Sequence, residues 1–316
     1  MQTTPSLPKI CAGGGCITVS LHGERAVFSE LSSTYPLKLL SPNIQGRTAL
    51  VYLLTYGGGL ISGDEVDLVV NVQLGAKLVL LSQGSTKVFK SRLGRRLASV
   101  ESQGSSLQPP LNRHDTNGTP TRQNIDFHIA ASCSLFLLPE PVTCFRDASY
   151  NQSQKFYIEG DGSMVILDWI TSGRISIGEE WAFSHYHSVN EVFDNGKRVA
   201  KDVMLLDDEQ LDNRIPERTL RERLQPYSCY AMLILYGPQV QSIVADISAR
   251  YDQISVFKTR VPDQLIWSLS PMDSTKKGVV VRVAGIQTEM VKDWLKETLS
   301  EVEVIIGRDV YRRVFP

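Results

Sequence analysis

The chain has 316 residues, of which 42% are hydrophobic, and a formal net charge of -1. That length can bury a sizeable core, and the near-neutral charge argues against a nucleic-acid binder that relies on a basic face. No apolar run reaches the roughly 20 residues that span a bilayer, and the five scattered cysteines form neither a disulfide framework nor a CxxC zinc pair. We therefore expect a cytoplasmic globular protein that binds neither nucleic acid nor membrane.

Short β-branched segments dominate the first two thirds of the chain. Each is bounded by Gly, Pro or Asn, which is typical of strands. The segments include CITVSLH, RAVFSEL, TALVYLLTY, VDLVVNVQ, AKLVLLS, IDFHIA, SMVILDWI, EWAFSHYHSVNEVF and KRVAKDVMLL. Because they do not alternate with helices in the manner of a parallel α/β sheet, we predict one mainly β domain over residues 1–316.

A polar stretch interrupts this pattern at residues 94–124. It is rich in Ser, Gln, Pro, Asn and Thr, too polar to pack, and we predict a disordered surface insertion there.

Helical spacing appears only late in the chain. PERTLRERL predicts a short helix, and QVQSIVADISARY predicts a longer one with its apolar residues on one face. A further helix is predicted over IQTEMVKDWLKETL, whose apolar face holds Ile286, Met290, Trp294, Leu295 and Leu299. The sequence thus indicates a β core with a few C-terminal helices.

The stretch TYGGGLISGD follows an apolar strand and raises the question of a phosphate loop. Gly58 and Gly63 have the P-loop spacing, but Asp64 stands where that motif requires Lys, and a carboxylate repels phosphate. A glycine-rich turn that presents Asp64 is the better interpretation. No GxSxG or HExxH motif occurs either, so we expect no enzyme activity.

The stretch HYHSVNE offers an alternative function. On a strand, His185, His187 and Glu191 share one face, and two imidazoles with a carboxylate suit a transition metal. The arrangement resembles the HxHxxxE stretch of cupins, which would make the chain a β-sandwich metalloenzyme. The flanking glycine spacing does not fit, and no histidine follows His187. A half-exposed strand without metal is the other interpretation.

Several carboxylates stand at unusual places. Asp64 follows the glycine loop, Glu140 lies between prolines, Asp168 interrupts an apolar strand, and Glu179 precedes Trp181 by two residues. Burial of an unpaired charge is costly, so such acids have a partner. Either Asp168 forms a salt bridge, for example to Arg174, or these acids face inward to hold a cation.

Five segments in fixed order carry a resemblance to a known family. They are YPLKLLSP, TYGGGLISGDEV, GAKLVLLSQGSTKVFKS, LFLLPEPVTCFRDASYNQSQKFYI and LDWITSGRISIGEEWAFSHYHS. This set resembles the urease accessory protein UreD (UreH) family from about residue 14 to residue 194, apart from the polar insertion. The resemblance is weaker over the helical third, and HYHS stands where family members commonly carry Arg-rich sequence.

The resemblance implies a mainly β fold of stacked, β-helix-like sheets and no enzyme activity. It implies a urease maturation chaperone that binds the urease apoprotein and a complex of UreF with UreG, as a dimer within that assembly, and helps deliver nickel to the urease active site. No cofactor is then held tightly, and Ni²⁺ passes only in transit. A β-rich interaction scaffold without an ion path is the simpler alternative.

The resemblance also carries over site residues. It implies a transient nickel path that includes Asp64, Glu140, Asp168 and Glu179. Loops around the path are shaped by Thr86, Lys87 and Arg146.

Overall fold

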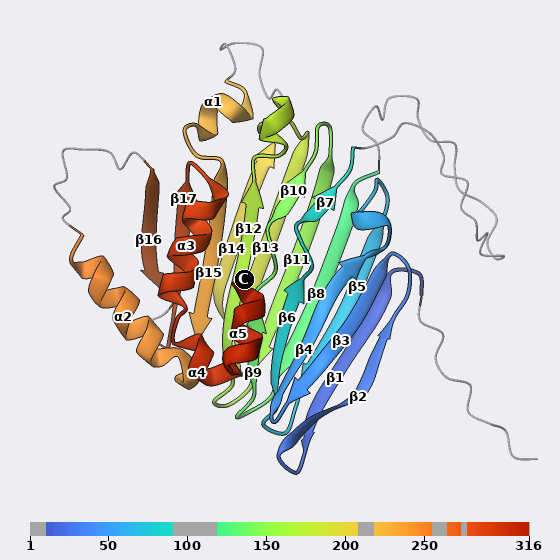
Figure 1. Ribbon diagram of the computed structural model, residues 1–316, viewed down its shortest axis with the longest axis vertical. Coiled ribbons are helices and arrows are strands. Elements are labelled where there is room, and N and C mark those ends of the chain that lie inside the picture. Colours follow the sequence, from blue (N-terminus) through green and yellow to red (C-terminus); the bar gives the residue numbers. More distant parts are fainter. Residues whose placement is uncertain (1–10, 91–118, 208–217, 255–263, 273–276, 316) are drawn as a thin grey trace, which may run out of the picture.

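The computed structural model describes residues 11–90, 119–207, 218–254, 264–272 and 277–315. Within these ranges, two large sheets pack face to face and a layer of helices lies on one side of the pair (Figure 1). The predicted mainly β architecture is confirmed.

Sheet A has the strand order β14-β13-β11-β8-β5-β1-β2. Its strands are β1 (Gly14–His22), β2 (Arg25–Ser33), β5 (Glu65–Val72), β8 (Thr121–Ile129), β11 (Ser149–Ile158), β13 (His185–Asp194) and β14 (Lys197–Asp207). Sheet B has the order β16-β17-β15-β12-β9-β6-β4-β3, with β10 beside β12 and β7 beside β10. Its strands are β3 (Leu37–Gln45), β4 (Thr48–Thr55), β6 (Lys77–Ser82), β7 (Thr86–Val88), β9 (Ser134–Leu137), β10 (Val142–Cys144), β12 (Ser163–Thr171), β15 (Cys229–Tyr236), β16 (Leu265–Pro271) and β17 (Gly278–Gly285).

The helices lie mainly in the C-terminal third. They are α1 (Leu220–Leu224), α2 (Gln241–Asp252), α3 (Thr288–Thr298), α4 (Val302–Ile306) and α5 (Arg308–Val314), with 3-10 turns η1 (Tyr56–Gly58), η2 (Ile175–Ile177) and η3 (Pro238–Val240). The short helix predicted over PERTLRERL is α1, which begins with a capping box between Thr219 and Glu222. None of the helices in the described ranges is long and apolar enough to cross a bilayer.

From β4 to β13 the main strands alternate between the two sheets. Strands β5, β8, β11 and β13 pair in parallel in sheet A, and β4, β6, β9 and β12 do so in sheet B. Parallel neighbours need a crossover connection, and here the crossover is a strand of the opposite sheet instead of a helix. This coil is the β-helix-like stack that the family resemblance implies.

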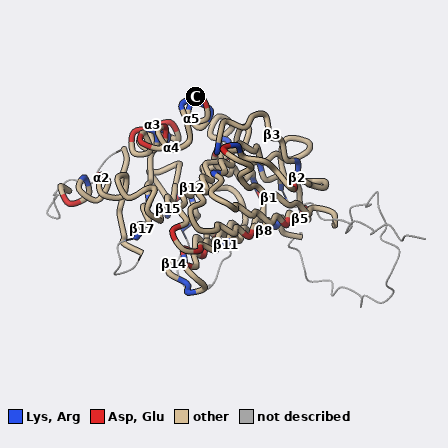
Figure 2. Tube along the Cα trace, turned by 90° about the horizontal axis from the view of Figure 1, so that it is seen from below, with Lys and Arg blue, Asp and Glu red and all other residues tan. Residues whose placement is uncertain are grey.

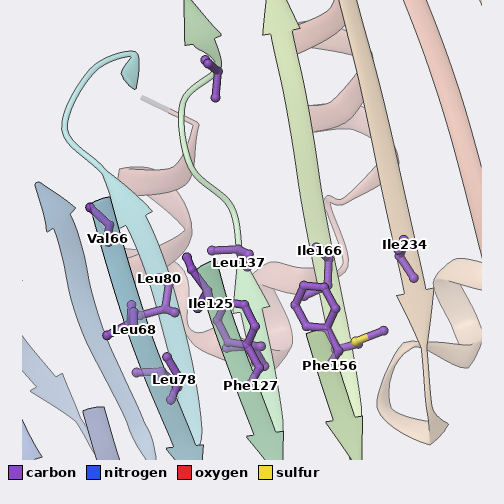
Figure 3. Packing of buried hydrophobic residues seen from close by; sticks show 14 of the residues in the cluster. Val66, Leu68, Leu78, Leu80, Ile125, Phe127, Leu137, Phe156, Ile166 and Ile234 are labelled. Atoms are coloured by element: carbon purple, nitrogen blue, oxygen red, sulfur yellow. The ribbon is translucent and has the colours of Figure 1, made fainter. Parts of the chain in front are cut away.

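The first core fills the space between the sheets. Strand β5 alternates buried and exposed residues, so that Val66, Leu68 and Val70 face sheet B. Leu78 and Leu80 of β6 face them from the other side (Figure 3). Burial of this apolar surface, at roughly 25 cal/mol per Å², is what holds the two sheets together.

A second core joins sheet B to the helices. Val79 and Leu81 of β6 point away from sheet A and pack in the same cluster as α2, α3, α4 and α5. Figure 2 shows α3, α4 and α5 on one side of the molecule and strands β8, β11 and β14 of sheet A on the other. The central strands of sheet B are therefore buried on both faces, whereas the outer face of β11 and β13 is only half-buried.

The structure differs from three of the sequence predictions about where helices and strands lie. Strands β15, β16 and β17 extend sheet B within the third of the chain where we expected helices. Strand β8 begins at Thr121, so the last residues of the predicted insertion are a strand, and its residues up to 118 lie outside the described part. In α3 the buried face centres on Val291, Leu295 and Thr298, while Trp294 is only half-buried.

Candidate functional site

Asp168 is a carboxylate placed inside the core between the sheets. In β12, Met164, Ile166 and Ile170 face sheet A, whereas Val165, Leu167 and Trp169 face the helices. Asp168 has the parity of the first group because side chains alternate along a strand. It is only 9% exposed, so the strand places a charge where the pattern otherwise places apolar residues.

The carboxylate of Asp168 is held by three donors from sheet A. The Ser188 hydroxyl donates to Oδ2 at 2.6 Å, and the Asn190 amide donates to the same oxygen at 2.8 Å. The Gln152 amide donates to Oδ1 at 3.2 Å. Burial raises the pKa of Asp168 above its ordinary value, although these three hydrogen bonds act in the opposite direction. The predicted salt bridge to Arg174 is wrong, because Arg174 binds another acid.

Asp168, Gln152, Gln154, Ser188 and Asn190 form what we call the polar cluster. All five are buried; the three hydrogen-bond partners of Asp168 come from β11 and β13, and Gln154 lies on β11 next to Asn190 in the strand register. The amide oxygens of Gln154 and Asn190 have no hydrogen-bond partner among the described residues. Buried amide oxygens are normally paired, so these two are exceptions, and Asn190 carries one of them on the same side chain that donates to the Asp168 carboxylate.

Asp202 and Arg282 lie beside the polar cluster, on the edge strand β14 and on β17. They form an ion pair between the two sheets, and Asp202 itself is buried. Its charge contributes to the raised pKa of Asp168. This ion pair therefore links sheet A to sheet B beside the polar cluster.

Glu179 lies in the loop after η2 with two arginines. Arg174 donates to both of its carboxylate oxygens, at 2.7 and 2.9 Å, and Arg146 lies 3.7 Å away. The hydrogen bond from Arg174 holds the pKa of Glu179 below its ordinary value. Arg174 also stacks over the ring of Phe145 at 4.2 Å. This fixed bidentate pair is what we expect to shape the loop.

Asp64 stabilises the turn that leads into β5. Its Oδ2 accepts a hydrogen bond from the Ile61 amide at 2.9 Å, and its own amide donates to the Ile61 carbonyl. The side chain is buried. The Asp64 carboxylate therefore fixes the turn, and its presentation to a partner or cavity stays a prediction.

The glycines before Asp64 have separate causes. Gly57 and Gly58 adopt positive φ angles of 74° and 78°, which favour glycine. At Gly59 a Cβ would lie 2.6 Å from the carbonyl oxygen of Lys87, so the two backbones can approach only without a side chain there. The Leu60 amide donates to that same carbonyl, and Leu60 forms a parallel bridge with Val88 of the short strand β7, which begins at Thr86. Lys87 thus contacts the glycine loop through its backbone carbonyl, whereas the Thr86 amide donates to Pro141 and the loop-shaping role of Thr86 stays a prediction.

Glu140 lies on the side of sheet B that faces the helices, away from sheet A. Its Oε1 lies 3.1 Å from Nζ of Lys292 in α3, and its backbone amide donates to Ser82. The preceding carbonyl, of Pro139, accepts from the indole of Trp169, which belongs to the helix-side core. The four predicted acids are therefore divided among a turn, a loop, the inter-sheet core and the helical layer.

The metal site expected of a cupin-like enzyme is not formed. Glu191 pairs with Arg198 at 2.9 Å and Lys201 at 3.5 Å, away from the histidines. Burial disfavours its charged form, but these two cations hold the pKa of Glu191 below its ordinary value. Across the described ranges, no group of three or more His, Cys, Asp or Glu residues is placed to hold a metal ion.

Sequence reasoning missed the partners of Asp168. Gln152, Ser188 and Asn190 occupy inward positions of β11 and β13, and apart from Gln154 the other inward residues of these two strands are apolar or aromatic. The available signal was this break in the alternation, because a polar residue at an inward position of a strand must have a buried partner.

Comparison with known proteins gives one consistent result. A model of the family described as UreD urease accessory protein matches residues 13–314. The chain is 33% identical to urease accessory protein 4 of Cryptococcus neoformans var. grubii, over 97% of this chain and 96% of that protein. It is 31% identical to urease accessory protein D of Arabidopsis thaliana, over 94% and 99%. It is 30% identical to the urease accessory protein UreD of Sorangium cellulosum, over 96% and 84%.

Proposed function

The chain belongs to the UreD urease accessory protein family, whose members serve urease maturation without catalysing a reaction, and we propose that it helps deliver nickel to apo-urease. In this proposal it acts in an assembly with UreF and UreG, present there as a dimer, and nickel is cargo that passes without becoming a resident cofactor. The five free cysteines support a reducing, cytosolic setting for this work.

The polar cluster is the observation that carries the nickel proposal. A core built for stability alone would continue the apolar pattern of β12, because a buried charge costs free energy even when it is hydrogen-bonded. Here Asp168 is instead bound by one hydroxyl and two amide groups of sheet A, and the amide oxygens of Asn190 and Gln154 on the same strands have no partner in the described structure. We infer that an ion in transit takes up these unused oxygens.

The chemistry of the cluster suits passage better than storage. Nickel binds strongly to sets of imidazole or thiolate ligands, whereas carboxylate and amide oxygens hold it more weakly. A conducting site must admit the ion and also release it. Asp168 with Asn190 and Gln154 offers one charge and neutral oxygens, which meets both conditions.

We assign the remaining predicted acids different parts in this proposal. Asp64 and Glu179 fix loops that border the path, together with Thr86, Lys87 and Arg146. Glu140 is bound to Lys292 on the helical side of sheet B, so we assign it to the attachment of α3 rather than to the path.

Replacement of Asp168 by Asn tests the proposal. Urease and its other accessory proteins are produced with the wild-type chain, with Asp168→Asn, or with Asp161→Asn as a control. Asp161→Asn is the same chemical change at an exposed turn, where the Asp161 carboxylate accepts a hydrogen bond from the Ser132 amide. Complex formation is followed by co-purification, and the nickel content of the purified urease by metal analysis.

We expect Asp168→Asn to assemble normally and to load urease with less nickel, and Asp161→Asn to match the wild type in both. Full nickel loading by an assembled Asp168→Asn chain would refute the ion path and would leave an interaction scaffold as the function.

A further inference from the structure

His185 and His187 lie next to each other on the outer face of sheet A. Both belong to β13, two residues apart, so they point away from Ser188 and Asn190 of the polar cluster. Their ring centroids are 6.2 Å apart, and both side chains are half-buried. The pair is not used by the ion path proposed above.

The surroundings of His185 resemble the support of a metal-binding imidazole. Its Nδ1 lies 3.2 Å from the Oδ2 of Asp207, and its Nε2 lies 3.1 Å from the amide oxygen of Asn151. Metal-binding histidines commonly donate one ring N–H to a carboxylate, which fixes the ring and frees the other nitrogen for the ion. Asp207 is held in turn, because Arg223 of α1 donates to its backbone carbonyl.

We propose that His185 and His187 together bind one divalent transition-metal ion of the nickel, copper and zinc class. The ligands are Nε2 of His185, one ring nitrogen of His187 and the amide oxygen of Asn151, with water in the remaining positions. Asp207 acts as a positioning residue through Nδ1 of His185. Imidazole is a preferred ligand of these ions, and neither Mg²⁺ nor Ca²⁺ favours it.

The distance between the rings is compatible with a shared ion. A metal–nitrogen bond of about 2.1 Å places the ring centroid about 3.2 Å from the metal, so two rings on one ion lie about 4.5 to 6.4 Å apart for angles of 90 to 180°. The observed 6.2 Å falls within this range.

Glu191 is not part of this site, because Arg198 and Lys201 neutralise it. With two imidazoles, one amide oxygen and no carboxylate ligand, the site holds an ion less tightly than a closed set of three or four protein ligands would. Such a site captures an ion from solution and gives it up to a better ligand. The identification of the ion as nickel rests on the proposed function; the binding itself does not.

The test is calorimetric titration of the full-length chain, without an affinity tag, with NiCl₂ at pH 7.5. We expect one ion per chain with a Kd on the order of 1 to 10 µM. His185→Ala and His187→Ala should each weaken binding about tenfold or more, and the double variant should abolish it. Asp207→Asn should weaken binding about 10- to 100-fold, as expected of a residue that orients a ligand.

His128 provides the matched control, since it lies on β8 of the same sheet but stacks on Tyr157 at 4.9 Å instead of on a second histidine. His128→Ala should bind as the wild type does. Cu²⁺ loaded at one equivalent should show coupling to two nitrogen nuclei by electron paramagnetic resonance in the wild type and to one in either single variant.

Unchanged affinity and stoichiometry in the double variant, or coupling to one nitrogen in the wild type, would overturn the proposal. Circular dichroism checks folding, and His185→Gln with His187→Gln replaces any alanine variant that unfolds. Because no urease is present, a negative titration leaves the nickel-delivery proposal standing, and normal nickel loading by Asp168→Asn leaves this site standing.

Discussion

Replacing Asp168 by Asn should leave the free energy of unfolding within about 1 kcal/mol of the wild type at pH 7, or raise it. Asn keeps the shape of the side chain and one acceptor oxygen. Its new amide group stands where one carboxylate oxygen accepted a hydrogen bond; at the Oδ1 position the donor is Gln152, whose amide keeps the Ser188 hydroxyl as acceptor at 3.1 Å. The desolvation that raises the pKa of Asp168 disappears with the charge.

Asp168→Ala should behave differently. It removes the acceptor shared by Ser188, Asn190 and Gln152, and the two amides keep only the Ser188 hydroxyl, at 3.5 and 3.1 Å. Each buried donor without a partner costs roughly 1 to 3 kcal/mol, so we expect a loss of about 3 to 6 kcal/mol. The contrast between the Asn and Ala variants separates the cost of the charge from the value of the hydrogen bonds.

The pH dependence gives an independent check with a defined sign. A carboxyl whose pKa is raised by folding binds its proton more tightly in the folded state. Its stabilising contribution is therefore full below the pKa of the unfolded chain, near 4, and is lost as the pH rises through the folded value. Each unit of raised pKa is worth about 1.4 kcal/mol. The stability of Asp168→Asn relative to wild type should thus increase with pH.

Urea unfolding followed by circular dichroism from pH 5 to 8 measures both effects, provided that the denaturant dependence is the same in all variants. A loss of more than about 2 kcal/mol in Asp168→Asn at pH 7 would refute this reasoning. It would mean that the charge is required for folding, and any fall in nickel loading would then follow from instability.

Two further predictions concern the helical layer. Leu295→Ala should lower the free energy of unfolding by about 3 to 4 kcal/mol, because Leu295 is fully buried in the helix-side core. Trp294→Ala should lower it by only about 1 to 2 kcal/mol, because Trp294 is half-buried. Equal losses in urea unfolding would contradict this distinction. Glu140→Gln should change stability by less than about 1 kcal/mol, because the Lys292 pair is partly exposed, and should leave urease nickel content unchanged. Reduced nickel loading in that variant would return Glu140 to the ion path.

The architecture was predictable from sequence because its signals are local. Short β-branched segments bounded by turn residues indicated the strands, and the apolar face with Ile243, Val244 and Ile247 indicated α2. Strand β15 was not recognised, because a short apolar run such as CYAMLILY fits a buried strand or a buried helix equally well. The order of strands in each sheet comes from contacts that no local pattern contains.

The site was only partly predictable for a related reason. Asp168 stood out as an acid in an apolar strand, but both faces of β12 are buried, so its sequence shows no alternation that would indicate which face it takes. Its partners are 16 to 22 residues away, and the partner of Glu140 is 152 residues away. Side-chain pairing at such separations is set by the coil of the two sheets, which places β11 and β13 opposite β12.

The two faces of β13 present different donor atoms, and the difference is compatible with nickel capture on the outer face before nickel release from the inner cluster. His185 and His187 present nitrogen outward, whereas Ser188 and Asn190 present oxygen toward Asp168 inside. Nickel prefers imidazole to neutral oxygen, so the outer pair suits capture from dilute solution and the inner cluster suits rapid release. An ion cannot cross a hydrogen-bonded sheet between the two faces. Under the two proposals, transfer from one face to the other would therefore pass around an end or edge of β13, and His185 is the first residue of that strand, six residues after Glu179.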